Sequence, residues 1–199
     1  MSKQIIISIS REFGSGGHEI AEKIAKDLGL TLYDRSILDE IAEEKNVKAE
    51  ELRAVDEKPR NKLITRKVRG HSNSMEEHLK EMQFEFIKRK ADSGESFVVV
   101  GRCSETVLKG REGLISIFVL ADREEKIEHV MKKYGLSREE AITKNARHDR
   151  TRKMYHNQHS KIKWGDSRNY DICINSSRLG VEKTAEYLEE YIRERKRDD

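Results

Sequence analysis

Three closely spaced glycines, Gly14, Gly16 and Gly17, are the first candidates for chemistry in this chain. They follow the β-branched run IIISIS and open directly into the amphipathic sequence HEIAEKIAKDL. Glycine adopts backbone angles closed to other residues, so N–H groups around Ser15 can converge on one anion at a helix N-terminus, which carries partial positive charge. The pattern predicts a phosphate-binding turn that ends at His18, in the first turn of the helix.

The turn differs in charge from a Walker A loop, G-x-x-x-x-G-K-[ST]. Aligning the last glycine of that motif on Gly16 places Arg11 at the first glycine, Gly17 at the lysine and His18 at the hydroxyl residue. The planar guanidinium of Arg11 suits a phosphate oxygen, and we expect it to supply the missing charge. The alternative is a surface ion pair with Glu12. His18 either faces the anion or caps the helix.

Further candidates follow two other strand-like runs. Asp34 and Arg35 come after LTLY, and Arg102 comes after FVVVG. Because ligands bind at the carboxyl ends of parallel strands, we expect these residues at the same sheet edge as the glycine turn. Asp34 either contacts substrate or water-bound Mg²⁺, or caps a helix that starts at Ser36. Arg102 either binds a substrate phosphate or pairs with an internal carboxylate.

A basic segment, NARHDRTR, falls on a predicted long helix. Arg147 and Arg150 are three residues apart and share a face, whereas Arg152 is expected to face elsewhere. Residues 137–169 hold nine Lys or Arg against four Asp or Glu. This excess predicts a lid that closes over a polyphosphate, with Asp149 orienting the arginines; the alternative is a solvated helix face.

The histidines and cysteines do not predict a metal site. No cysteine or carboxylate completes a recognised zinc spacing with His148, His156 or His159, so no bound metal is expected from them. Cys103 and Cys173 lie far apart in sequence, next to predicted strands. We interpret both as packed thiols rather than as a disulfide.

Apolar runs alternate with helical stretches along the chain, which predicts an α/β fold with a parallel sheet covered by helices on both faces. The predicted strands are residues 4–9, 31–33, 96–100, 114–120 and 170–174. The predicted helices are residues 17–28, 36–44, 48–55, 75–92, 105–109, 123–134, 138–160 and 181–196. Ser137 with Glu140 forms a capping box for the seventh helix.

Composition is typical of a single soluble domain of 199 residues, with 35% apolar and 39% charged residues. A net charge of +3 is too balanced to predict nucleic-acid binding. The chain has neither an apolar run long enough for a membrane helix nor the features of a signal peptide, so we expect no membrane association and a cytoplasmic protein. Residues 56–74 are polar and weakly periodic, and we interpret them as mobile or as a partner surface.

Together these residues resemble the cytidylate kinase-like family, over nearly the whole chain. The segments that carry the resemblance are ISREFGSGGHEIAEKIAKDLG, LYDRSIL, FVVVGRCSETVL, ISIFVLADREEKIEHV and KIKWGDSRNYDICINSSRLGVEKTAEYL. The resemblance implies a P-loop NTPase-type three-layer fold with a five-stranded parallel sheet. It further implies a helical substrate-binding insertion at residues 35–95 and a lid at residues 137–169, within one domain.

The resemblance also implies roles for the candidate residues. Residues 14–18 would hold the donor phosphates, Arg102 would meet the acceptor phosphate, and Arg147 and Arg150 would be lid arginines. With Arg11, assigned above from its position, these arginines are the predicted catalytic residues. Substrate-binding residues would be Asp34, Arg35 and Arg102. Cytidylate kinases have Gly-Arg-Asp where this chain has Gly101-Arg102-Cys103, so the base of the acceptor is left open.

These expectations describe a kinase that uses ATP and Mg²⁺ to phosphorylate a nucleoside monophosphate, CMP-like or dCMP-like, or another small acceptor. The rival interpretation is a nucleotide-binding regulator that has lost turnover together with its lysine. A third, an RNA-binding module, lacks an aromatic-rich binding signature. Association with a second copy of the chain is left open.

Overall fold

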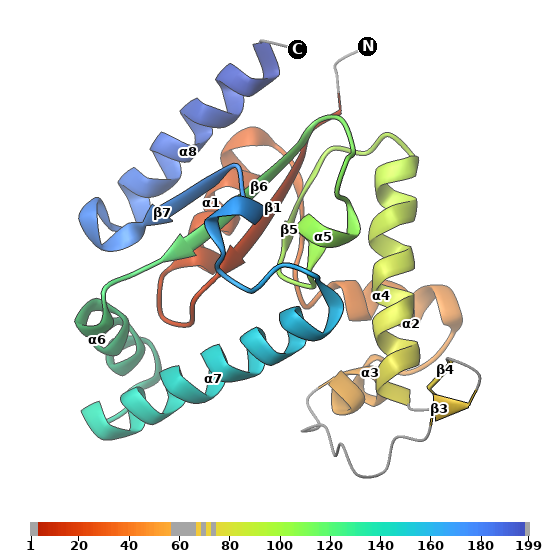
Figure 1. The fold of residues 1–199 in the computed structure, drawn as a ribbon, viewed down its shortest axis with the longest axis horizontal. Helices are drawn as coiled ribbons and strands as arrows, with labels where there is room; N and C mark the ends of the chain where they lie inside the picture. Colours follow the sequence, from red (N-terminus) through yellow and green to blue (C-terminus); the bar gives the residue numbers. More distant parts are fainter. Residues whose placement is uncertain (1–3, 57–66, 69–70, 73–74, 198–199) are drawn as a thin grey trace. The chain divides into compact units, whose positions relative to one another are not determined.

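The computed structural model describes residues 4–56, 67–68, 71–72 and 75–197. Its centre is a five-stranded sheet in the order β2-β5-β1-β6-β7 (Figure 1). The strands are β1 (Ile6–Arg11), β2 (Thr31–Tyr33), β5 (Phe97–Val100), β6 (Leu114–Leu120) and β7 (Ile172–Asn175). β1 pairs in parallel with β5 and β6, and β6 pairs in parallel with β7. The predicted parallel α/β sheet is therefore confirmed.

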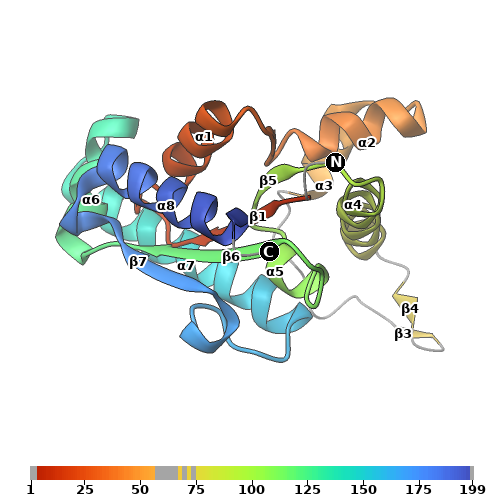
Figure 2. The same ribbon diagram turned by 90° about the horizontal axis from the view of Figure 1, so that it is seen from above.

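Helices cover both faces of this sheet, as Figure 2 shows for α1 and α8 on one side and α5 and α7 on the other. These helices are α1 (Gly17–Leu28), α5 (Ser104–Val107), α7 (Arg138–His159) and α8 (Gly180–Arg197). Ile7 and Ile9 of β1 belong to the apolar core that α1 and α8 complete. Ser8 and Ser10 point to the opposite face, where they hydrogen-bond to Ser104 and to a carboxylate of α5. The alternation along β1 thus separates an apolar face from a polar one.

The strand predicted at residues 4–9 begins and ends two residues later. Ile6 pairs with Leu114, and the ladder continues until Arg11 pairs with Val119. Arg11 is therefore the last residue of β1 rather than a residue after it. Its backbone position is fixed by the sheet, which matters for the direction of its side chain.

α6 (Arg123–Tyr134) follows β6 and contacts both α1 and α7. The predicted capping box at the start of α7 is confirmed, because Ser137 and Glu140 exchange side-chain-to-backbone bonds. Glu19, in the first turn of α1, pairs with His129 and Lys133 of α6. The hydrogen bond from His129 lowers the pKa of the Glu19 carboxyl well below its ordinary value; burial opposes the shift and Lys133 adds to it.

Residues 33–93 form a second compact unit, close to the predicted insertion at residues 35–95. It contains α2 (Ile37–Lys45), α3 (Ala49–Asp56), β3 (Lys67–Val68), β4 (His71–Ser72) and α4 (Met75–Asp92). Leu38, Val55 and Leu79 form its core, and Tyr33 meets Phe86 edge to face at 5.3 Å. Most of the segment predicted to be mobile or a partner surface, residues 56–74, lies outside the described residues.

Among the described residues, no helix combines the length and apolar character needed to cross a membrane. Cys103 is buried, as predicted, but Cys173 is exposed. Cys173 differs from the prediction because it lies on β7, at the edge of the sheet.

Candidate functional site

The glycine turn between β1 and α1 requires glycine at two positions. Gly14 and Gly16 adopt φ angles of 78° and 71°, which side chains disfavour. A Cβ on Gly14 would also lie 2.8 Å from the carbonyl oxygen of Lys126. Ser15 is buried and donates its hydroxyl to the Glu12 carbonyl at 2.9 Å, so its side chain braces the turn. These contacts fix a tight turn between β1 and α1, and phosphate binding by its backbone stays a prediction.

Arg11 fills the space in which a Walker lysine would begin. A Cβ on Gly17 would lie 2.6 Å from the Arg11 Cβ and 3.1 Å from its Cγ. Further out, the Arg11 guanidinium passes so close to Gly101 that a Cβ there would collide with it. The positive charge therefore runs from the end of β1 toward the end of β5, across the base of the glycine turn. This placement fits the hypothesis that Arg11 replaces the lysine, which stays a prediction.

His18 forms an i,i+4 pair with Glu22, with 3.3 Å between Nε2 and Oε1. This contact runs along α1, and the side chain is partly exposed. Phosphate contact by His18 stays a prediction.

The turn after β5 is in an unusual backbone conformation. Gly101, Arg102 and Cys103 have φ angles of 77°, 58° and 53°, so two residues with side chains occupy the left-handed region in succession. Each costs about 1–3 kcal/mol unless its surroundings impose it. Ser104 imposes it here, since both its N–H and its hydroxyl donate to the Gly101 carbonyl, at 3.1 and 2.8 Å. The strain holds Arg102 at the carboxyl edge of the sheet, where the sequence predicts it.

Helix α7 contacts the glycine turn through Asp149. One carboxylate oxygen of Asp149 accepts from the Phe13 backbone N–H at 2.6 Å, and the other lies 3.2 Å from Lys126 Nζ. The same ammonium donates to Glu12 at 2.9 Å. Burial lowers the pKa of Lys126, but the hydrogen bond to Glu12 and the charges of Glu12 and Asp149 outweigh it and raise that pKa above its ordinary value. A lysine from α6 thus stays charged beside the turn.

Arg152 also contacts the turn, and it lies on a different face of α7 from Arg147 and Arg150, as predicted. Its Nη1 donates to the Arg11 carbonyl at 3.2 Å, and its guanidinium lies 5.4 Å from the Phe13 ring centre. Arg147 and Arg150 are exposed. Asp149, Arg152 and the buried residues of α7 share one face, and Arg147 and Arg150 lie on the other. A catalytic role for these two arginines stays a prediction, and the structure adds Arg152 as a candidate.

In the second unit, Asp34 precedes α2. Its Oδ1 accepts a hydrogen bond from the Ser36 backbone N–H at 2.9 Å. This contact agrees with the alternative that Asp34 caps the helix after it. Arg35 is exposed at the same helix start. Contact of Asp34 and Arg35 with an acceptor stays a prediction.

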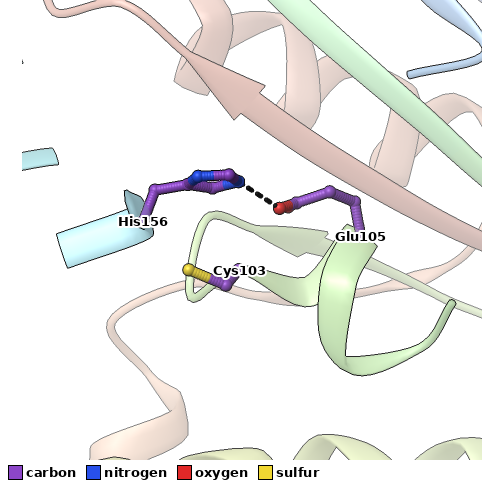
Figure 3. A group of neighbouring side chains, drawn as sticks. All are labelled: Cys103, Glu105 and His156. Carbon is purple, nitrogen blue, oxygen red and sulfur yellow. Dashed lines mark hydrogen bonds and ion pairs between the residues drawn. The ribbon is translucent and has the colours of Figure 1, made fainter. Parts of the chain in front are cut away.

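A buried polar group that the sequence did not indicate lies between α7 and the turn after β5. His156 Nε2 lies 2.8 Å from a carboxylate oxygen of Glu105, and Cys103 is beside them (Figure 3). The sequence shows no recognised zinc spacing around the histidines, yet the fold brings a cysteine and a carboxylate to His156. Sequence spacing could not reveal this, because the partners are about fifty residues away and meet His156 only in the folded chain.

A five-stranded parallel sheet with a glycine turn between β1 and α1 defines the P-loop kinase class of fold. The pattern of the cytidylate kinase-like family matches residues 6–178, and the chain belongs to that family. A search of curated proteins finds no match.

Solved structures show the same fold. An uncharacterized protein from Eubacterium ventriosum is 36% identical, with a TM-score of 0.75, over 95% of this chain and 98% of that one. Shikimate kinase from Bacteroides thetaiotaomicron is 12% identical, with a TM-score of 0.55, over 95% of this chain and 98% of that one. Shikimate kinase from Acinetobacter baumannii, solved with shikimate, is 13% identical, with a TM-score of 0.51, over 96% and 94%. At such low identity, the shikimate kinases establish the fold alone.

Proposed function

We propose that this protein is a cytoplasmic kinase that transfers the γ-phosphoryl group of ATP to a nucleoside monophosphate, CMP-like or dCMP-like, or to another small acceptor. The observation that carries the proposal is the path of Arg11. Its side chain occupies the place of the Walker lysine, beside a backbone cradle that excludes side chains at Gly14 and Gly16. Membership of the cytidylate kinase-like family supports the same reaction class.

The residues of the glycine turn fit a polyphosphate. A Cβ on Gly14 would collide with the Lys126 carbonyl and a Cβ on Gly16 with Val181, so only glycine fits at either position. A glycine-rich turn that opens into a helix N-terminus is a typical anion-binding site. Arg11, Lys126 and Arg152 bring three positive groups to the turn, against the carboxylates of Glu12 and Asp149. When bound, ATP with Mg²⁺ supplies the phosphoryl group and neutralises part of its charge.

The acceptor needs no catalytic base, because a phosphate oxygen is already a nucleophile at neutral pH. The work of the chain is to position two anions and to offset their repulsion. Arg102 is suited to the acceptor phosphate, since its strained turn holds it at the carboxyl edge of the sheet. Cys103 replaces the aspartate of cytidylate kinases, so readout of the base differs from theirs.

A nucleotide-binding regulator without turnover is the second candidate. One contact favours it: the Asp149 carboxylate occupies the Phe13 N–H, at the entrance to the glycine turn. A carboxylate at this position repels an incoming phosphate unless α7 moves. The two candidates therefore differ in whether α7 releases this contact during a reaction cycle.

The test is ADP release from Mg-ATP with CMP, dCMP, UMP, AMP, GMP, shikimate or no acceptor, together with detection of the phosphorylated product. We expect release that depends on one class of nucleoside monophosphate. The variant Gly14→Ala should abolish release, because its Cβ meets the Lys126 carbonyl; circular dichroism checks that it folds. ATP binding by calorimetry without product from any acceptor would favour the regulator, and absence of ATP binding would refute both candidates.

A further inference from the structure

Three chemically different metal ligands meet at one buried point of the molecule. One ring nitrogen of His156, the sulfur of Cys103 and a carboxylate oxygen of Glu105 all lie within 4.8 Å of one another. Figure 3 shows the side chains converging from α7, from the turn after β5 and from the start of α5. In tetrahedral zinc sites, ligand atoms lie about 3.5 Å apart, so modest side-chain rotation brings these three within range of one ion.

Burial makes this arrangement costly without a cation. The side chains of His156 and Glu105 are only 3% and 0% exposed, and Cys103 is 3% exposed. His156 Nε2 meets Glu105, but its Nδ1 is buried with no hydrogen-bond partner. A buried nitrogen without a partner costs about 1–3 kcal/mol. The nitrogen that faces Glu105, and that would bind the ion, is Nε2.

The surroundings orient the carboxylate as outer partners orient metal ligands. Ser10 donates its hydroxyl to one oxygen of Glu105 at 3.2 Å, and Thr106 donates to the other at 3.1 Å. Such outer hydrogen bonds fix ligand geometry in metal sites. The anchoring residues come from the central strand β1 and from α5.

We propose that Cys103, Glu105 and His156 bind a Zn²⁺ ion. A thiolate, a neutral imidazole and a carboxylate are the nitrogen, sulfur and oxygen ligands that zinc accepts, and together they carry two negative charges against its two positive ones. On binding, the Cys103 thiol releases its proton to solvent and the Glu105–His156 hydrogen bond is replaced by bonds to the ion. Water completes the tetrahedral shell.

Zinc at this site fastens α7 to the turn that carries Arg102. His156 is on the helix, four residues beyond Arg152, which contacts the glycine turn. The ion therefore holds in place both the end of α7 and the turn that carries Arg102. This inference does not depend on the proposed kinase activity.

The test uses the purified full chain stripped of metal with a chelator. Titration with Co²⁺ as a spectroscopic probe should give one equivalent bound, with a thiolate-to-cobalt charge-transfer band. Cys103→Ser and His156→Asn should abolish the band, whereas the matched controls Cys173→Ser and His159→Asn should keep it. Loss of the outer partner in Ser10→Ala should weaken Zn²⁺ binding about 10–100-fold. A band that survives Cys103→Ser, or binding in wild type well below one equivalent, overturns the proposal.

A second measurement uses the wild-type chain, so it does not depend on the folding of a variant. Stripped protein with and without Zn²⁺ is exposed to an alkylating reagent, and modification of each cysteine is followed by mass spectrometry. Zn²⁺ should slow alkylation of Cys103 at least tenfold and leave that of Cys173 unchanged. Equal rates at Cys103 with and without Zn²⁺ show that the group is a hydrogen-bonded cluster only, which also overturns the proposal.

Discussion

Two substitutions would move the positive charge of Arg11 to the position of a Walker lysine. Their effects follow from the distances between Gly17 and the atoms of Arg11. Arg11→Gly removes a charge-assisted contact with phosphate, worth about 1.5–3 kcal/mol, so ATP affinity should fall roughly 10–150-fold. Gly17→Lys alone places a Cβ 2.6 Å from the Arg11 Cβ, where ordinary contacts begin at 3.4 Å. Overpacking of this kind costs about 1–3 kcal/mol of stability.

The double variant Arg11→Gly/Gly17→Lys should recover both losses in part. It removes the Cβ and Cγ of Arg11, the two nearest atoms, which leaves the Val119 Cβ at 3.2 Å as the closest contact. Its lysine starts where a Walker lysine starts. Arg11→Ala/Gly17→Lys is the matched control, because alanine keeps the Cβ and therefore the 2.6 Å clash. The wild type, the single variants and the two double variants are compared by their ATP dissociation constants, from calorimetry, and by their melting temperatures, from circular dichroism. The reasoning is refuted if Arg11→Gly changes ATP affinity less than twofold, or if the two double variants are equally stable.

Three further predictions concern stability. Arg102→Gly should raise the free energy of unfolding by about 1 kcal/mol, because glycine tolerates a φ of 58°. The same variant should lower turnover at least tenfold. An unchanged free energy of unfolding in urea would contradict the inference that Arg102 is strained. Glu19 has a lowered pKa, so its contribution is complete above the unfolded value of about 4.3 and is lost as pH falls below it. Wild type should therefore lose more stability than Glu19→Gln between about pH 5 and pH 2. An equal loss of unfolding free energy in both proteins, measured with urea at each pH, would exclude this. Ile117→Ala, at 0% exposure, should cost about 2–5 kcal/mol, and Tyr187→Ala, at 53%, less than about 0.5; similar urea midpoints would be inconsistent with the described core.

Much of the fold follows from local sequence signals. The run LISIFVL is apolar on both faces and forms a central strand, β6. The amphipathic stretch after the glycine turn becomes α1, which ends at Gly29 with a φ of 64°. The box formed by Ser137 and Glu140 starts α7 where predicted. These features depend on neighbours in sequence, so the sequence alone could predict them.

The inward face of α7 could not be predicted in this way. An amphipathic helix shows its buried side as an apolar stripe, but α7 has no such stripe along its length. Its buried positions include Asn145 and His156, which no hydrophobic pattern distinguishes from solvated residues. Spacing alone therefore separated Arg152 from Arg147 and Arg150, but it could not show that the face with Arg152 is the one that contacts the turn. The contact between His156 and Glu105 escaped prediction for the same reason.

The absence of a Walker lysine and the position of Arg11 are one structural feature rather than two. The space over Gly17 is filled by the Cβ of Val119 and by the Cβ and Cγ of Arg11. The end of the same side chain requires a second glycine, because a Cβ on Gly101 would collide with the guanidinium. Glycine at both positions is what allows an arginine from β1 to cross the base of the turn. Under the proposed function, this arginine would supply from the strand side the positive charge that a Walker lysine supplies from the start of the helix.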